Sequence, residues 1–351
     1  MMITFSDFLH AAVSNPYMLI SLVLTVGVVI ANGWANAPNA VASSVATRSV
    51  SPAKAILVAG IFNAMGLIAM TFINSSVALT IYRMVDFRGN QRHSLVALYA
   101  AMAAILIWTF AAWKIGIPTS QGHALIAAVS GAAVALQGGL SGIYWSEWVK
   151  VLYGLVLSVV LSVVLGFSLS LFTEMLFTNA VRRKTTPFFK KAQIGGAAAL
   201  SFMNGAQDGQ KLMGLFLLGL FLAKGNYGTD NVRIPLWIMV TCAFFTTAGT
   251  FIGGARIIRT VGLKMVKIEP YQGVAADLAA SASLMIASLL GLPASLNQTK
   301  TMAVIGGGAS RKLSAVNWGL VKGIVLTWIF TFPGCGLLGY MLAWLLIKLF
   351  G

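Results

Sequence analysis

Long apolar stretches alternate with short polar connections along the whole chain of 351 residues. A membrane-spanning helix needs ~20 consecutive apolar residues, whereas the strands of a transmembrane barrel show short alternating runs. The pattern predicts an all-α polytopic membrane protein with about 10–12 membrane segments. Ten are recognised, at residues 16–34, 55–81, 95–113, 117–137, 149–178, 194–223, 235–254, 272–290, 293–310 and 318–349. The fourth and ninth are short and rich in glycine, so each either spans the membrane or re-enters it as a hairpin.

Composition agrees with this pattern. Hydrophobic residues make up 58% of the chain and charged residues only 9%, which excludes an ordinary soluble domain. The formal net charge of +16 would suggest nucleic acid as a partner of a soluble protein. Here the cations lie largely at the ends of apolar segments, where they indicate orientation in the lipid bilayer, and no nucleic acid is expected. Lipid binding by the basic stretch 182–191 is an alternative role.

The placement of the basic residues predicts an orientation. Two loops without acidic residues, RRKTTPFFKK at 182–191 and RIIRTVGLKMVK at 256–267, carry five and four Lys or Arg. The positive-inside rule puts both in the cytoplasm. Counting membrane crossings outward from them puts both termini outside.

An internal repeat connects the two halves of the chain. Asn32-Gly33 matches Asn204-Gly205 at an offset of 172, and GIPTSQGHALIAAVSG from Gly116 matches GLPASLNQTKTMAVIG from Gly291 at an offset of 175. Five segments per half is an odd number, so the second copy enters the membrane from the opposite face. The prediction is two inverted repeats at 1–178 and 193–351, joined by a basic cytoplasmic linker at 179–192.

Four matching helix breaks lie at membrane depth. They are NGWANAPNA at 32–40, NGAQDGQK at 204–211, and the GIPTS and GLPAS stretches that end at Ser120 and Ser295. A broken helix survives in hydrocarbon only where it lines protein or a watery cavity. Any one break alone is explained by a proline kink or by packing of small residues. Four in symmetric register predict discontinuous helices or hairpins whose N-termini, capped by the serines, face an anion.

Ionisable residues within the apolar segments are functional candidates because an unpaired charge there costs several kcal/mol. Asp208, beside carbonyls expected to be unwound, is predicted as a cation ligand suited to Na⁺ or H⁺. Asp277 has either a site role or a wet position near the cytoplasmic interface. Lys211 either pairs with Asp208 or faces the anion, and Lys300 stands unpaired opposite a Leu of the other repeat. For His123 three roles are open: it shuttles protons, it binds the substrate, or it packs in the core with its hydrogen bonds satisfied.

Three stretches carry a family resemblance: GWANAPNA at 33–40, GAQDGQKLMG at 205–214 and TVGLKMVKIEPYQGVAADLAAS at 260–281. They resemble the duplicated signatures of the inorganic phosphate transporter (PiT) family of cation-coupled symporters. The resemblance implies that the family's two Asn-Asp motifs, here Ala35-Asn36 and Gln207-Asp208, bind cations. Together with the family's two Ser-Thr-Thr loops, here residues 120–122 and 295–297, they are implied to surround phosphate. Implied substrate-binding residues are Asn36, Ser120, Gln121, Gly122, Gln207, Ser295 and Asn297. Implied cation-binding residues are Asn36, Asn39, Asn204, Asp208 and Gln210. Auxiliary candidates are Asn32, Lys211, His123, Asp277 and Lys300.

The chain departs from the family pattern where charge matters. Ala35-Asn36 stands where relatives carry Asn-Asp, Gln207 replaces Asn, and Asn63 stands where relatives often carry Glu. Two intramembrane carboxylates are thus neutralised. We therefore expect fewer coupled Na⁺ ions, coupling to protons, or a monovalent oxyanion as substrate.

The predicted function is a secondary active symporter of inorganic phosphate, working by alternating access in a prokaryotic inner membrane. Alternatives are a permease for sulfate or another oxyanion and a non-coupled channel or receptor. The chain contains no H-E-x-x-H or G-x-S-x-G motif, and no enzyme activity is expected. The expected metal is Na⁺ only, as a coupling ion with H⁺ as its alternative, and no cofactor is expected. A homodimer is left open.

Overall fold

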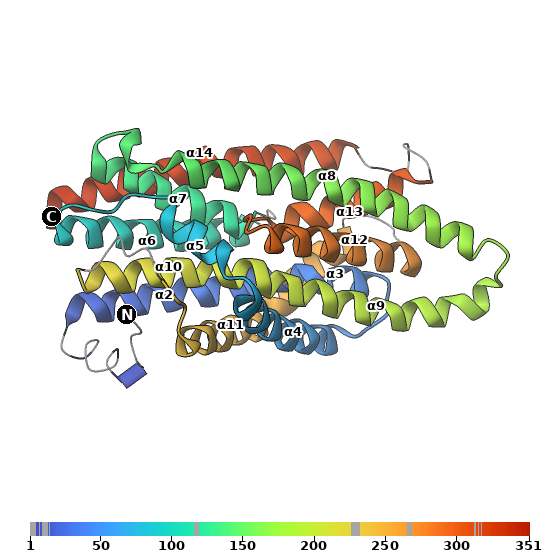
Figure 1. The fold of residues 1–351 in the computed structure, drawn as a ribbon. Coiled ribbons are helices and arrows are strands. Elements are labelled where there is room, and N and C mark those ends of the chain that lie inside the picture. The colour runs from blue at the N-terminus through green and yellow to red at the C-terminus, as the bar shows by residue number, and fades with distance from the viewer. Residues whose placement is uncertain are drawn as a thin grey trace.

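A computed structural model gives the structure of the chain and describes residues 15–115, 119–225, 232–264, 269–311 and 318–351, with the isolated positions 5, 6, 8, 13, 314 and 316. These residues form an elongated bundle of helices (Figure 1). The first helix of the bundle begins, and the last one ends, at the same end of the molecule.

The helices follow one another with short connections. In chain order they are α2 (Pro16–Ala35), α3 (Ala37–Ala46), α4 (Pro52–Ile73), α5 (Ser76–Arg83), α6 (Gln91–Ile115), α7 (Gln121–Gln137), η1 (Leu140–Gly142), α8 (Trp145–Leu176), α9 (Arg182–Asn204), η2 (Gly205–Gly209), α10 (Gln210–Ala223), α11 (Leu236–Lys264), α12 (Pro270–Leu289), α13 (Leu296–Ala309) and α14 (Trp318–Phe350).

Seven spans within the described residues are long and apolar enough to cross a membrane, so the protein is a multi-pass integral membrane protein. They are Pro16–Ala46, Pro52–Ile73, Gln91–Ile115, Trp145–Leu176, Leu236–Gly253, Pro270–Leu289 and Val321–Phe350. The other three predicted segments correspond to α7, to α13 and to the interrupted path α9–η2–α10. Helices α7 and α13 have only 17 and 14 residues. Each packs against the helix before it, α6 and α12 respectively, in opposite halves of the bundle (Figure 1).

The predicted breaks have different forms. The first is confined to Asn36, between α2 and α3, so Asn32-Gly33 are helical and Pro38 lies in the first turn of α3. The unwinding predicted over 204–211 is wrong: residues 205–209 form η2, a π-helical turn that continues into α10. A π-turn keeps backbone hydrogen bonds within the helix while it re-aims the side chains. Residues 292–295 are non-helical as predicted, whereas 116–118 lie outside the described residues.

Two predicted loops are largely helical. Residues 182–191 form the first turns of α9, and 256–264 belong to α11, while 265–267 lie outside the described residues. Lys and Arg are good helix formers, and the buried Phe189 anchors α9 because its ring lies 5.0 Å from that of Phe177. A further break, between α4 and α5, was not predicted. It occurs where Asn74 Oδ1 accepts a hydrogen bond from the Ser76 amide at 2.9 Å, a local bond that competes with the helix.

The two halves of the chain pack into each other through close glycine contacts. A methyl group at Gly166 of α8 would collide with the carbonyl of Ala303 on α13. A methyl group at Gly339 of α14 would collide with the carbonyl of Ala128 on α7. The glycines are 173 residues apart and the alanines 175, so the two contacts repeat at the offsets found in the sequence.

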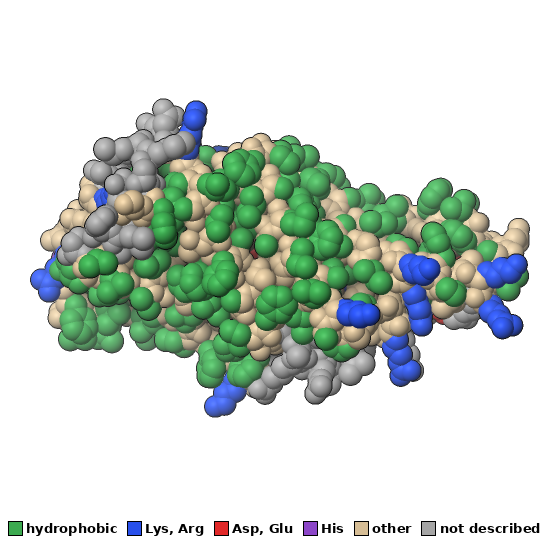
Figure 2. Space-filling view, turned by 90° about the horizontal axis from the view of Figure 1, so that it is seen from below, with side chains coloured by type: hydrophobic (Ala, Val, Ile, Leu, Met, Phe, Trp, Pro, Cys, Tyr) green, Lys and Arg blue, Asp and Glu red, His purple; other side chains and the backbone are tan. Residues whose placement is uncertain are grey.

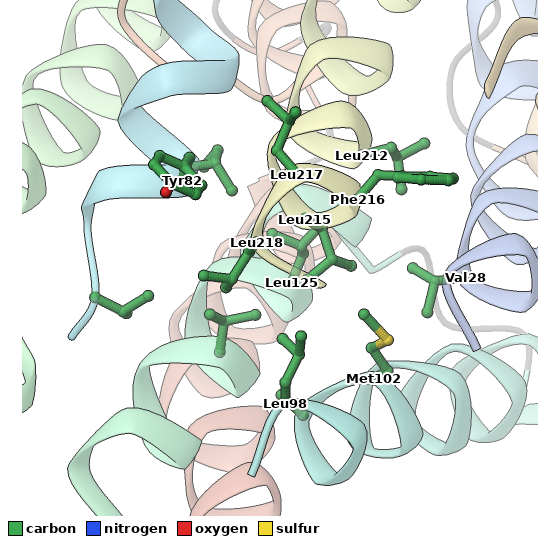
Figure 3. Close-up of a cluster of buried hydrophobic side chains, with 14 of the residues drawn as sticks. Val28, Tyr82, Leu98, Met102, Leu125, Leu212, Leu215, Phe216, Leu217 and Leu218 are labelled. Atoms are coloured by element: carbon green, nitrogen blue, oxygen red, sulfur yellow. The ribbon is translucent and has the colours of Figure 1, made fainter. Parts of the chain in front are cut away.

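Small residues face inward and large ones outward, as expected where lipid surrounds the protein. On α8, Ser158 and Ser162 are buried, whereas Val156, Val160 and Val164 are exposed. Hydrophobic side chains cover the middle of the molecule in Figure 2, and Lys and Arg gather at its narrower end. A compact apolar core, which includes Met102, Leu125 and Leu215, joins α6, α7 and α10 (Figure 3).

Candidate functional site

Two helix N-termini meet at the centre of the described bundle. Ser120 and Ser295 are the residues immediately before α7 and α13, and their hydroxyl oxygens lie 2.8 Å apart. Ser120 Oγ also accepts a hydrogen bond from the His123 amide at 3.4 Å, as an N-cap does. The free amides and the positive dipole ends of both helices therefore converge on one position, which is an arrangement that attracts an anion.

A chain of side-chain amides leads from this position to a carboxylate. Asn39 Nδ2 donates to Asn297 Oδ1 at 2.9 Å. Asn297 Nδ2 donates to Asn36 Oδ1 at 2.9 Å and to the carbonyl of Thr119, also at 2.9 Å. Asn36 Nδ2 in turn donates to Asp208 Oδ2. The break between α2 and α3, the start of α13 and the π-turn η2 thus share one hydrogen-bonded cluster, called the amide relay below (Asn36, Asn39, Asn297).

Asp208 is ion-paired within this cluster. Lys211 Nζ lies 2.8 Å from Asp208 Oδ1 and also donates to the carbonyl of Ala294, next to Ser295. Each side chain of the pair is no more than 3% exposed. The Lys211 ammonium passes beside Gly122 of α7, where an added Cβ would lie 2.8 Å from Nζ. Of the two roles predicted for Lys211, the pairing with Asp208 is the one observed, although the ammonium also lies close to the start of α7.

A second buried ion pair lies beside the relay. Lys300 Nζ is 2.9 Å from Asp277 Oδ1. The expectation that Lys300 is unpaired is therefore wrong, because the partner comes from a different helix. Asp277 is fully buried, which excludes the wet interfacial position. Ser43 contacts both groups and was not singled out in the sequence. It lies three residues beyond the polar stretch 32–40, on the helix α3 that follows the break.

Three of the predicted residues brace the surrounding helices. Gln207 Nε2 donates to Ser288 Oγ at 3.0 Å, and its Oε1 accepts from the Ala294 amide at 2.9 Å. Gln121 Oε1 accepts from the hydroxyl of Thr109 at 2.6 Å. Gln210 Nε2 donates to the carbonyl of Asn74 at 2.7 Å.

Several buried amide oxygens, which belong to three predicted cation ligands and to the auxiliary candidate Asn32, carry no hydrogen bond within the described structure. They are Oδ1 of Asn32, Asn39 and Asn204 and Oε1 of Gln210. Buried oxygen atoms without a donor are suited to a cation, because carbonyl oxygens are ligands of hard cations. The buried ring of His123 lies 4.7 Å from that of Phe332 on α14.

Comparison with known proteins gives a consistent result. The model of a family described as "Phosphate transporter family" matches residues 32–339. A probable low-affinity inorganic phosphate transporter of Bacillus subtilis is 36% identical over 340 residues, covering 95% of this chain and 100% of the relative. One of Rhizobium meliloti is 34% identical over 307 residues, covering 88% and 90%. A solved structure described as "The sodium-dependent phosphate transporter" has the same fold, with a TM-score of 0.84 and 22% identity over 95% of this chain and 99% of the other.

Proposed function

The chain belongs to the phosphate transporter family, and we propose that it carries inorganic phosphate across the plasma membrane of a prokaryote together with Na⁺ or H⁺. The observation that carries this proposal is the meeting of two half-helix N-termini at Ser120 and Ser295, whose hydroxyl oxygens are 2.8 Å apart. Two sets of amide donors and two hydroxyl groups aimed at one place suit a tetrahedral oxyanion.

Phosphate binding replaces contacts that the site residues make with one another. Its oxygens accept from the amides at the starts of α7 and α13 and from the two serine hydroxyls, which exchange their mutual hydrogen bond for the substrate. The Asn297 amide, which donates to the carbonyl of Thr119 at 2.9 Å, is close enough to contribute a further donor. A protonated phosphate oxygen donates a hydrogen bond to Asn36 or Asp208. Sulfate has no proton to donate at neutral pH, so it cannot make this contact.

Cation coupling follows from the position of Lys211. Its ammonium lies 2.8 Å from Asp208 and beside Gly122 at the start of α7. When Na⁺ or a proton neutralises Asp208, Lys211 loses its partner and turns to the phosphate at the helix N-termini. The unpartnered oxygens of Asn39, Asn204 and Gln210 complete the coordination of the cation. The anion and the cation thereby stabilise each other's sites.

The fold is proposed to consist of two inverted repeats, residues 1–178 and 193–351, with residues 179–192 between them. The support is the repetition of packing contacts, because the contact of Gly166 with Ala303 recurs as that of Gly339 with Ala128. The same plan accounts for hairpins α6–α7 and α12–α13 in opposite halves of the bundle (Figure 1). Rocking of one repeat against the other then exposes the central site alternately to each side, with both termini outside.

The number of cations is limited by membrane electrostatics. Moving a phosphate dianion into a negative-inside cell costs roughly 4.6 kcal/mol per 100 mV, so two monovalent cations are needed to cancel that cost. In the described central cluster Asp208 is the one carboxylate, since Asn36 occupies the symmetric position. We infer that the chain couples to fewer Na⁺ ions than an acidic site would, or carries phosphate in its monovalent form.

Uptake of [³²P]phosphate by the purified protein in proteoliposomes tests the proposal. We expect saturable uptake that rises with an inward Na⁺ or proton gradient and that unlabelled phosphate inhibits more strongly than sulfate. Uptake without saturation or gradient dependence would identify a channel. Stronger inhibition by sulfate would assign the site to that anion, and lack of uptake under every gradient would refute the transport function.

A further inference from the structure

The ammonium group of Lys300 is surrounded by oxygen atoms. Its Nζ lies 2.9 Å from each of three, the carbonyl of Ala40, the hydroxyl of Ser43 and a carboxylate oxygen of Asp277. The Ser43 hydroxyl also contacts both carboxylate oxygens of Asp277, at 2.9 and 3.0 Å. A carbonyl, a hydroxyl and a carboxylate are the ligand types that hold hard cations in proteins. We call this group of three oxygen ligands the oxygen cage (Ala40, Ser43, Asp277).

The cage joins three helices at membrane depth. Ala40 and Ser43 belong to α3, Asp277 to α12 and Lys300 to α13. The side chain of Asp277 is 0% exposed and that of Lys300 10% exposed. An isolated charge in such a place is costly, so each charge depends on the other for its compensation.

The matching positions of the other half contain no polar group. At the repeat offsets of 172 and 175, the counterparts of the cage and of Lys300 are Leu212, Leu215, Met102 and Leu125. All four are labelled in the apolar cluster of Figure 3 and belong to one buried hydrophobic core. The same helix junction therefore packs with apolar side chains alone. The charges are therefore a feature of one half only, and this asymmetry points to a functional role.

The cage lies next to the proposed phosphate site. Ala40 directly follows Asn39 of the amide relay, and Lys300 lies about one helical turn after Asn297. Asn39 and Asn297 are joined by a hydrogen bond of 2.9 Å. The ammonium group of Lys300 is thus separated from the relay by a single turn of α13, so a change in the net charge of Lys300 and Asp277 alters the electrostatic field at an anion bound there.

We propose that Lys300 is a tethered counter-ion: its ammonium group occupies an oxygen-lined cation site beside the substrate site and supplies a positive charge that a mobile cation would otherwise bring. The role of Lys300 as a counter-ion rests on the proposed phosphate transport. The cation site itself is inferred from the three oxygen contacts and does not depend on that function. Removal of the ammonium group is predicted to leave a site that binds Na⁺ or a small ammonium ion.

Cation-dependent stability tests the site directly. The unfolding temperature of purified Lys300→Ala is measured in Na⁺, K⁺ or ammonium chloride and compared with choline chloride at equal ionic strength, without phosphate. A ligand that binds only the folded state raises this temperature. We expect Na⁺ or ammonium to raise it more in Lys300→Ala than in the wild type. The added response disappears in Lys300→Ala/Asp277→Asn.

Leu125→Ala is the matched control, because it shortens the side chain at the symmetric position without exposing a carboxylate. It should show the same cation response as the wild type. Equal responses of Lys300→Ala and Leu125→Ala would overturn the proposal.

A folding failure of Lys300→Ala is also informative. If the variant is recovered only when it is purified in Na⁺ or ammonium salts, the cage binds these cations. If it fails equally in all salts while Lys300→Met/Asp277→Asn is recovered, the lysine serves only to neutralise Asp277 and the proposal is wrong.

A transport measurement tests the counter-ion role of Lys300 separately from the proposed phosphate transport. In proteoliposomes, Lys300→Ala should carry about one more ²²Na⁺ per phosphate than the wild type, since a mobile ion takes the place of the fixed one. An unchanged ratio would refute the counter-ion role. If the wild type itself moves no phosphate, the proposed function fails, but the stability measurement still decides whether the cage is a cation site.

Discussion

Ser120 and Ser295 are separated by 175 residues in the chain, yet their hydroxyl oxygens are 2.8 Å apart. Each is the residue before a short helix, and the two helices enter the centre from opposite ends of the bundle (Figure 1). The contact therefore joins two positions that the proposed repeats make equivalent. It places matching anion-binding helix termini on either side of one point, where a single oxyanion can use both.

The two serines are predicted to contribute comparably to phosphate affinity. Ser120→Ala and Ser295→Ala each remove a hydroxyl donor to a charged ligand, a contact worth about 1.5–3 kcal/mol. The Michaelis constant for phosphate uptake should rise roughly 10- to 100-fold in each variant. Ser158→Ala is the control, since the buried hydroxyl of Ser158 donates to the carbonyl of Leu155 in its own helix. If the Michaelis constants of both serine variants equal that of Ser158→Ala, the two serines are excluded from the substrate site.

Neutralising Asp208 is predicted to impair stability and coupling together. In Asp208→Asn the buried ammonium of Lys211 loses its ion-pair partner at 2.8 Å, which costs about 3–5 kcal/mol of folding free energy. Thermal unfolding should show this loss of stability. The double variant Asp208→Asn/Lys211→Met should regain part of the lost stability, because it no longer buries an unpaired ammonium group. Phosphate uptake by the double variant should no longer respond to a Na⁺ gradient. Uptake that remains fully coupled would assign the cation to other residues.

Asn36→Asp is predicted to increase the demand for cations. Asn36 donates to Asp208, so the substitution places two carboxylates in contact, and a proton or a further cation must separate them. The ratio of ²²Na⁺ to phosphate should rise by about one, or uptake should become more dependent on acid pH. Asn15→Asp, at the exposed start of α2, adds the same charge away from the site and should leave the ratio unchanged.

Close helix packing is predicted to tolerate no methyl group at the paired glycines. Gly166→Ala and Gly339→Ala would force backbones apart on α8–α13 and α7–α14, at a cost of about 1–3 kcal/mol each. Gly323 of α14 has no neighbouring atom within 4 Å of an added Cβ, so Gly323→Ala should be neutral or stabilising by about 0.5–1 kcal/mol. Unfolding temperatures measured in detergent rank the stabilities of the three variants. If Gly323→Ala loses as much stability as Gly166→Ala and Gly339→Ala, the packing account is contradicted.

The sequence predicted the parts of the fold that depend on local chemistry. Apolar stretches identified the spanning helices, and the Gly-x-Pro-x-Ser pattern located the non-helical approach to Ser295. The form of the second break was not predictable, because a π-turn at Gly205–Gly209 and an unwound segment both need glycine and polar residues. The carbonyl of Asn63 approaches Gly205 so closely that an added methyl group would collide with it, and this contact with α4 is not visible in the local sequence.

The pairing of Lys300 was also beyond local inference. Its acidic partner Asp277 lies 23 positions earlier on another helix, and the two oxygen ligands on α3 lie 257 and 260 positions earlier, so no local pattern around Lys300 indicates them. By contrast, Lys211 lies three positions from Asp208, so its pairing was one of two local predictions. Long-range contacts of this kind require the three-dimensional arrangement of the two halves.

Protection of an engineered cross-link tests most directly whether phosphate binds between the two half-helices. Ser120→Cys/Ser295→Cys is made in a background without the native cysteines, Cys242→Ala/Cys335→Ala, and disulfide formation is followed in the membrane. We predict that the pair cross-links readily and that phosphate with Na⁺ slows the reaction in a saturable way, more effectively than sulfate with Na⁺. Cross-linking at the same rate with and without phosphate, or failure of the two cysteines to join, would contradict a substrate site at this contact.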